Sequence, residues 1–169
     1  MTNQSAAIAA APSSAGRFIA ITAAAAVTAS VAAFAATVLA VPVWAMFIGW
    51  VAYYTRGHSA RDGLVNFVCL ALGLGLGMVA ASLVGSLAPT LSALALPLVV
   101  LIVAAVVVSL RAVPTFNNIP SYFLGLISVF AAHVQPSLEA MAELGVAGAI
   151  GSFAGWLAGA LQLRVSRAE

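Results

Sequence analysis

Few side chains in this sequence could act as acids, bases, nucleophiles or metal ligands. The carboxylates fall outside the apolar runs, and His58 and His133 stand in segments expected on opposite sides of the molecule. Cys69, the single cysteine, lies within an apolar run, so one chain can build no disulfide or cysteine metal site, and we expect a small buried hydrophobe. No serine–histidine, cysteine–histidine or paired-aspartate arrangement is apparent. The sequence therefore predicts a protein that is not an enzyme and has no metal or cofactor.

Neutral amides are the polar side chains best suited to meet a solute. Asn117 and Asn118 lie in an irregular stretch, 111–120, and each amide can both donate and accept hydrogen bonds. They could replace a solute's hydration at a pore mouth, or serve as a turn or helix cap. Asn66, within an apolar run, is expected to hydrogen-bond to another helix.

The composition places these side chains in a membrane. Of 169 residues, 64% are hydrophobic and 6% are charged, whereas soluble domains have about a quarter charged residues. Because about 20 apolar residues cross a bilayer, the polar clusters divide the chain into six predicted transmembrane helices: 17–39, 41–54, 63–84, 91–110, 121–133 and 144–163. We expect a turn at Ser86, Pro89 and Thr90, a kink at Pro97, and a loop carrying Glu139 and Glu143.

The fold class expected is an all-α integral membrane protein with one six-helix domain, 17–165. A flexible cytoplasmic tail, 1–16, precedes this domain, and a short cytoplasmic end, 166–169, follows it. The run 18–40 contains small-x-small sites typical of signal-peptide cleavage, but at about 23 residues it has the length of a membrane span. We therefore interpret it as a retained helix.

The arginines give the predicted orientation. All six basic residues are arginines: Arg17, Arg56, Arg61, Arg111, Arg164 and Arg167. The six-helix map places all of them on one side, which is the cytoplasmic side of a bacterial inner (plasma) membrane, with both chain ends there. The net charge of +2 is too small and too dispersed for a nucleic-acid surface.

The second and fifth predicted helices resemble each other. Pro42, Trp44, Phe47 and Gly49 are matched by Pro120, Tyr122, Phe123 and Gly125. The third and sixth helices carry matching ladders of small residues: Gly73, Gly77 and Ala81, and Gly151, Gly155 and Gly159. Because each unit has three crossings, the second must enter the membrane in the opposite orientation. The pattern predicts two inverted three-helix repeats, 17–86 and 87–165.

The short second and fifth helices indicate where a pathway would lie. Short, proline- or glycine-interrupted segments at matching positions of two repeats point to a route near the membrane midplane. Their aromatic residues could form apolar constrictions, or pack and lie at the membrane interface. The predicted pathway residues are Trp44, Phe47, Gly49, Asn117, Asn118, Pro120, Tyr122, Phe123 and Gly125. The glycine ladders could pack within one chain or against a second copy in a homo-oligomer.

These residues resemble a known family. The segments 44–49, with 52–54, and 120–125, with Phe130 and Ala131, are similar to those of the YcdZ-like bacterial inner-membrane proteins, which carry a domain of unknown function, number 1097. The resemblance covers the second to sixth helices. It implies a small multi-spanning plasma-membrane protein, and it brings no substrate or catalytic residue.

The function predicted is a channel or facilitator for a small neutral solute. The predicted helix cores contain no ionisable residue, which disfavours coupled transport and charged-ring ion conduction. Passive passage through a narrow, mostly apolar pore remains. The alternative is a non-transporting membrane subunit that docks partners through its glycine-rich helices, in which case the ladders should face outward.

Overall fold

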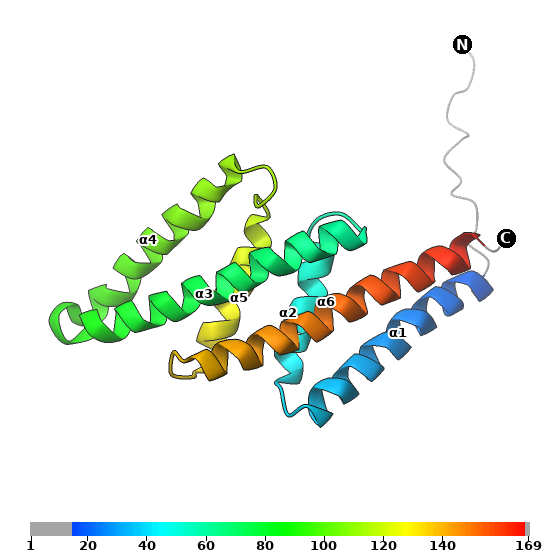
Figure 1. Ribbon diagram of the computed structural model, residues 1–169, viewed down its shortest axis with the longest axis horizontal. Helices are drawn as coiled ribbons and strands as arrows, with labels where there is room; N and C mark the ends of the chain where they lie inside the picture. The colour runs from blue at the N-terminus through cyan, green and yellow to red at the C-terminus, as the bar shows by residue number, and fades with distance from the viewer. Residues whose placement is uncertain (1–14, 168–169) are drawn as a thin grey trace, which may run out of the picture.

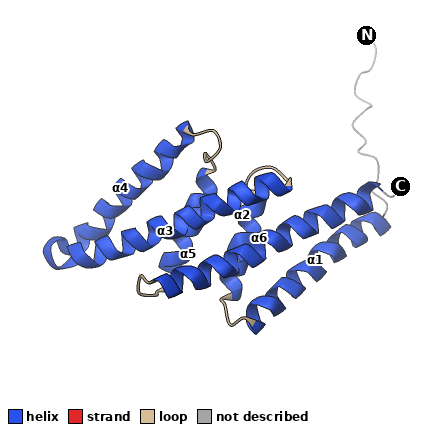
Figure 2. Ribbon diagram, in the orientation of Figure 1, coloured by secondary structure: helices blue, strands red, loops and turns tan. Residues whose placement is uncertain are grey.

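The computed structural model describes residues 15–167, which fold into helices joined by short links and contain no strand (Figures 1 and 2). Two short 3-10 turns, Ser92–Leu94 and Leu110–Ala112, flank one of the helices. The α-helices are α1 (Ala15–Val38), α2 (Val43–Tyr54), α3 (Ala60–Leu91), α4 (Ala95–Ser109), α5 (Ile119–Ala132) and α6 (Leu138–Arg167). The described part of the predicted tail, Ala15 and Gly16, belongs to α1, and residues 1–14 lie outside the described range.

The helices are arranged in two layers. In Figure 1, α1, α6, α3 and α4 lie next to one another across the front, while α2 and α5 cross behind α3 and α6. The closest packing in the molecule joins α2 to α6 and α5 to α3. Each short helix is therefore held by a long helix of the other half of the chain.

Three helical stretches in the described residues are long and apolar enough to cross a membrane: Ala15–Val38, Ala60–Ala112 and Leu138–Val165. The second stretch runs through α3, α4 and their 3-10 turns. The helices α2 and α5 are apolar but have only 12 and 14 residues. This composition and these lengths mark the chain as a membrane protein.

The helix ends that carry arginines lie on the same side of the molecule. In the orientation of Figure 1, three helices have their first residues toward the top of the picture: α1, α3 and α5. The other three have their last residues there: α2, α4 and α6. We call this side the arginine side, because Arg17, Arg56, Arg61, Arg111 and Arg164 all belong to these ends.

Two expectations about proline-containing segments were wrong. The turn expected at Ser86 to Thr90 is helical, because α3 continues through Pro89 to Leu91. The chain turns instead at Ser92, which has a φ of 47°. Pro97 lies in the first turn of α4, where a helix needs no amide donor, so it is not an interior kink.

The loop expected around Glu139 and Glu143 is part of α6. Ser137 Oγ accepts a hydrogen bond from the backbone amide of Ala140 at 3.0 Å, as a helix N-cap does. Glu139 follows in the first turn, where a carboxylate interacts favourably with the helix dipole. Capping thus extends α6 beyond the apolar run from which its start was predicted.

The core has two parts. In one, Ala32 and Ala36 of α1 and Met46 and Ala52 of α2 are buried with residues of α3, α5 and α6. In the other, α4 contributes a valine every fourth residue, Val99, Val103 and Val107, which pack with residues of α3 and α5. This spacing is one face of an α-helix.

Candidate functional site

The contact between α2 and α6 depends on glycines. A Cβ on Gly151 would overlap the carbonyl oxygen of Met46, and one on Gly49 would overlap the carbonyl of Gly148. Both neighbours are backbone atoms, so they cannot move aside as a side chain could. These two glycines therefore let the two helix backbones approach more closely than any larger residue would allow.

The contact between α5 and α3 repeats this arrangement in the same register. A Cβ on Gly73 would overlap the carbonyl of Tyr122, and one on Gly125 would overlap the carbonyl of Leu70. One turn further along the ladders, Gly77 faces Val129 and Gly155 faces Tyr53. Gly159, the last rung, lies near the hydroxyl of Tyr53. The described ladder glycines thus pack within the chain, across the two halves.

A cluster of neutral polar side chains lies where α2, α3 and α5 meet on the arginine side. We call Thr55, Asn66, Asn118 and Ser121 the amide cluster. Asn118 Nδ2 donates to Asn66 Oδ1 at 2.6 Å and to Thr55 Oγ1 at 2.7 Å, and Thr55 Oγ1 lies 3.0 Å from Ser121 Oγ. Asn66 and Ser121 are 0% exposed and Asn118 is 3% exposed. Three of the four side chains are therefore buried, and Thr55 is half-buried at the edge of the cluster.

Each donor in the amide cluster is fully used. Thr55 Oγ1 donates its hydrogen to the Ala52 carbonyl at 2.7 Å, so Ser121 must be the donor in the bond between the two hydroxyls. Asn66 Nδ2 donates its two hydrogens to the carbonyls of Tyr53 and Arg56, at 3.0 and 2.7 Å. These carbonyls lie in the last turn of α2 and just beyond its end, where backbone acceptors lack helical partners. The prediction that Asn66 bonds to another helix is confirmed.

An arginine next to the cluster joins two links of the chain. Arg56 donates to Asn117 Oδ1 and to the Thr115 carbonyl, the latter at 3.4 Å, and so joins the α2–α3 link to the α4–α5 link. Hydrogen bonds from a guanidinium are stronger than those between neutral groups. Asn117 thus faces outward to Arg56, while its neighbour Asn118 faces inward to Asn66. Asn118 occupies the N-cap position of α5, but its side chain makes no capping bond.

The link beside Arg56 is fixed by the start of α3. Ser59 Oγ donates to Asp62 Oδ2 at 2.7 Å and accepts from the Asp62 amide at 3.0 Å. Gly57 has a φ of 67°, and a Cβ there would collide with the Asp62 carboxylate.

The other half of the chain has no equivalent of the amide cluster. The glycine register relates Thr55 to Ala131, Asn66 to Leu144 and Ser121 to Ala45, all apolar residues. Leu144 and Ala45 are buried, like their polar counterparts. The two ends of the α2–α5 pair are therefore chemically different, polar on the arginine side and apolar on the opposite side.

The predicted pathway residues do not line one channel. Gly49, Tyr122, Gly125 and Asn118 are buried in helix contacts, whereas the others are exposed or lie on the outer surface: Trp44, Phe47, Asn117, Pro120 and Phe123. None of the described clefts is lined by both α2 and α5. The aromatic side chains therefore do not form two facing constrictions in this state, because Trp44, Phe47 and Phe123 point outward.

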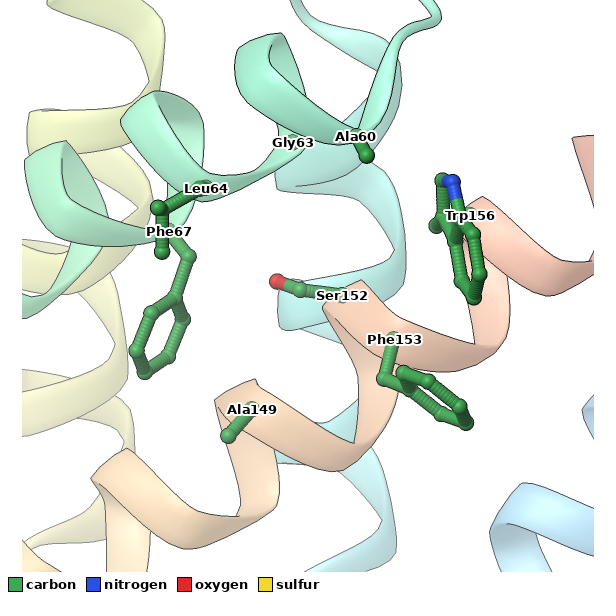
Figure 3. A pocket seen from close by; sticks show the side chains of 8 residues that line it. All are labelled: Ala60, Gly63, Leu64, Phe67, Ala149, Ser152, Phe153 and Trp156. Carbon is green, nitrogen blue, oxygen red and sulfur yellow. The ribbon is translucent and has the colours of Figure 1, made fainter.

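A shallow groove lies between α3 and α6 on the front of the molecule. It has a volume of about 290 Å³ and is mostly apolar, with Phe67, Phe153 and Trp156 around it (Figure 3). Ser152, the hydroxyl in this view, donates to the carbonyl of Gly49 at 3.0 Å. The Ser152 hydroxyl is therefore already used within the chain, and the other polar side-chain group in the lining is the indole N–H of Trp156. Within residues 15–167, no three histidine, cysteine or acidic side chains gather as metal ligands would.

One comparison with known proteins gives a family. A family described as "Protein of unknown function (DUF1097)" matches residues 20–161. The chain belongs to this family. The match begins within α1, so the resemblance noted for the second to sixth helices extends to the first. No curated protein and no solved structure matches the chain. The DUF1097 assignment thus identifies relatives without giving an activity.

Sequence reasoning missed three members of the site. Thr55 and Arg56 appeared to be parts of a polar link, and Ser121 appeared to be a helix start. Their partners stand more than 50 residues away, and no local pattern pairs them: Thr55 with Ser121, Arg56 with Asn117, and Asn66 with Asn118. The sequence feature that could have pointed to Thr55, Arg56 and Ser121 is their position as polar residues at the ends of short apolar helices.

Proposed function

We propose that this protein is a bacterial inner-membrane facilitator for a small neutral solute, and that the solute passes between α2 and α5. The observation that carries the proposal is the amide cluster. Polar side chains buried in a membrane protein are costly, and they commonly mark substrate pathways. In this protein the buried polar side chains lie where the two short helices, α2 and α5, meet. The sequence predicted a pathway at these two helices.

The proposed architecture is a pair of inverted three-helix repeats with six spans and both ends on the cytoplasmic side. Its support is the shared register of the glycine contacts, in which Gly73 and Gly151 meet the carbonyls of Tyr122 and Met46. The exchange of partners agrees with it, since α2 packs on α6 and α5 packs on α3. Positive residues on one side fit the cytoplasmic orientation.

The proposed class of solute follows from the neutrality of the amide cluster. Its four side chains are neutral, and each carries donors and acceptors. A solute such as urea, an amide or a polyol could exchange hydrogen bonds with them without leaving a charge unpaired. An ion would need compensating charges or rings of carbonyls. We propose passive passage, with no catalysed reaction.

The described state is closed in this proposal. All donor hydrogens of the Thr55, Asn66 and Asn118 side chains are engaged within the chain, so a solute must displace a bond to enter. Arg56 and Asn117 form a second closure outside the cluster. Opening therefore requires that α5 move away from α2 and α3 on the arginine side.

Stopped-flow light scattering on proteoliposomes tests this function. Uptake of urea, acetamide, glycerol and water is compared for the wild type, Ser121→Ala and empty vesicles. We expect solute-selective flux above that of empty vesicles, and faster flux in Ser121→Ala, because the variant loses the bond to Thr55. Ser128→Ala is the control, since Ser128 is buried in the same helix but bonds only to the carbonyl of Leu124.

Absence of excess flux in the wild type and in Ser121→Ala, with both proteins folded, would reject the facilitator. The non-transporting subunit would then be the better hypothesis. The subunit hypothesis would need a docking surface other than the glycine ladders. A ladder that docks a partner must be accessible, whereas these glycines pack inside the chain: Gly73, Gly77, Gly151 and Gly155.

A further inference from the structure

An apolar cleft lies between α4 and α5, with α3 at its base. Its volume is about 340 Å³, and its lining includes Val100, Val103, Ala104, Phe123, Ile127 and Phe130. All residues that line it are apolar, and several at its rim are exposed. The helix α4 packs on α3 and has little contact with α5, so the cleft is open along its length.

The corresponding helices of the other half pack differently. There α1 packs on α6 more extensively than α4 packs on α3. Tyr54, the counterpart of Phe130, donates from its hydroxyl to the Gly155 carbonyl at 3.1 Å and so binds α2 to α6. Phe130 has no hydroxyl and cannot form such a bond. The two halves thus differ in how extensively their first helices pack and in this tyrosine bond.

A positive charge stands above the cleft on the arginine side. At 3.6 residues per turn, Val100, Ala104 and Arg111 fall on one face of α4 and its continuation, and Arg111 is exposed. From Val100 to Arg111 the helix rises about 16 Å, which is close to the thickness of one hydrocarbon leaflet, about 15 Å. A lipid in that leaflet would therefore have its acyl chain at the cleft and its phosphate near Arg111.

We propose that this cleft binds one acyl chain of an anionic phospholipid from the leaflet on the arginine side, with the headgroup phosphate held by Arg111. An apolar chain matches a lining without polar side chains, and an anionic headgroup matches an arginine at the membrane surface. The assignment depends on the membrane location of the helices and not on solute transport.

Native mass spectrometry of the purified full chain tests the site, with phosphatidylglycerol and phosphatidylcholine added as probes. The wild type is expected to retain one phosphatidylglycerol. Ala104→Trp fills the cleft and is expected to weaken retention of both lipids by at least about tenfold. Arg111→Gln is expected to keep the acyl chain but to lose about fivefold in preference for phosphatidylglycerol.

Leu101→Trp is the matched control, because Leu101 is exposed on α4 and does not line the cleft. Ile127→Trp, at the exposed rim on α5, gives a second way to fill the cleft if Ala104→Trp does not fold. The proposal would be overturned if lipid retention were unchanged in both Ala104→Trp and Ile127→Trp. It would also be overturned if Leu101→Trp reduced lipid retention as much as these two variants do. Loss of a dimer in Ala104→Trp without loss of lipid would assign the cleft to a second copy instead.

Discussion

At the residue scale, the central feature is the bond between Asn66 and Asn118. Buried amides in a membrane protein can satisfy their donors only within the protein, so their positions are fixed by their partners. Asn117 and Asn118 are adjacent in sequence, yet one is exposed and one is buried. Sequence reasoning identified both amides as candidates but could not tell which faces inward, because the choice depends on Asn66 and Arg56 from another part of the chain.

Asn118→Ala is expected to destabilise the protein through this bond. The variant leaves Asn66 Oδ1 without its donor in a buried site, and an unsatisfied buried polar group costs about 1–3 kcal/mol. Thermal unfolding in detergent, followed by circular dichroism, measures the loss. Asn117→Ala is the control, since it removes only an exposed contact with Arg56 and should have a smaller effect. Equal melting temperatures for the two variants would contradict the argument.

At the element scale, the matched ladders predicted from sequence have matched surroundings in the structure. Gly73 and Gly151 stand at corresponding places in α3 and α6, and each faces a carbonyl of a short helix. The sequence register indicated that the two helices are equivalent. It did not reveal that each ladder packs on the short helix of the other half, because glycine spacing describes one helix face and not its neighbour.

Other element features could not be predicted because capping decided them. The start of α6 lies at Leu138, ahead of the apolar run, where Ser137 caps the helix and Glu139 occupies its first turn. The start of α3 similarly follows the Ser59 cap. Hydropathy locates the part of a helix that lies in lipid, whereas capping groups locate its true ends.

Gly151→Ala and Gly73→Ala are expected to disrupt folding to a similar degree. A Cβ at either position overlaps a backbone carbonyl, so the two helices must separate. Overpacking costs about 1–3 kcal/mol where side chains can adjust, and here the obstacle is backbone, so we expect a cost at or above that range. The yield of monodisperse protein on size-exclusion chromatography measures it.

Gly145→Ala is the control for these two variants, because Gly145 is also in α6 and has open space where its Cβ would lie. It should express and migrate like the wild type. A tolerated Gly151→Ala would mean that α2 and α6 do not pack as closely as described. If Gly73→Ala folds normally while Gly151→Ala does not, the two helix contacts are not equivalent.

At the scale of the whole molecule, the two ends of the α2–α5 pair differ in how they are held. Hydrogen bonds of the amide cluster and of Arg56 hold the arginine side, whereas the positions equivalent to the cluster on the other side are Ala45, Ala131 and Leu144. The two halves therefore share the glycine backbone contacts but differ in polarity at these positions. In a facilitator this difference makes the arginine side the end that must be unlocked.

Cys69 gives a direct measure of that unlocking. It is the single cysteine, it is 0% exposed, and it lies in α3 one turn after Asn66, in the core that includes Tyr122 of α5. A thiol reagent can reach it when α5 moves away from α3. Weakening the cluster by about 1–3 kcal/mol should raise the population of the open form, and hence the labelling rate, by about 5- to 150-fold.

We therefore expect a small maleimide to label Cys69 faster in Asn118→Ala than in the wild type, when both are folded in proteoliposomes at the same temperature. Ser128→Ala should label at the wild-type rate, because its bond to the Leu124 carbonyl lies within α5. A membrane-impermeant reagent should label Asn118→Ala only from the arginine side, since the opposite end keeps its apolar packing. Equal labelling of Asn118→Ala from both sides would mean that this variant unfolds or opens throughout. Labelling of Asn118→Ala at the wild-type rate would mean that the amide cluster does not hold α5 against α3.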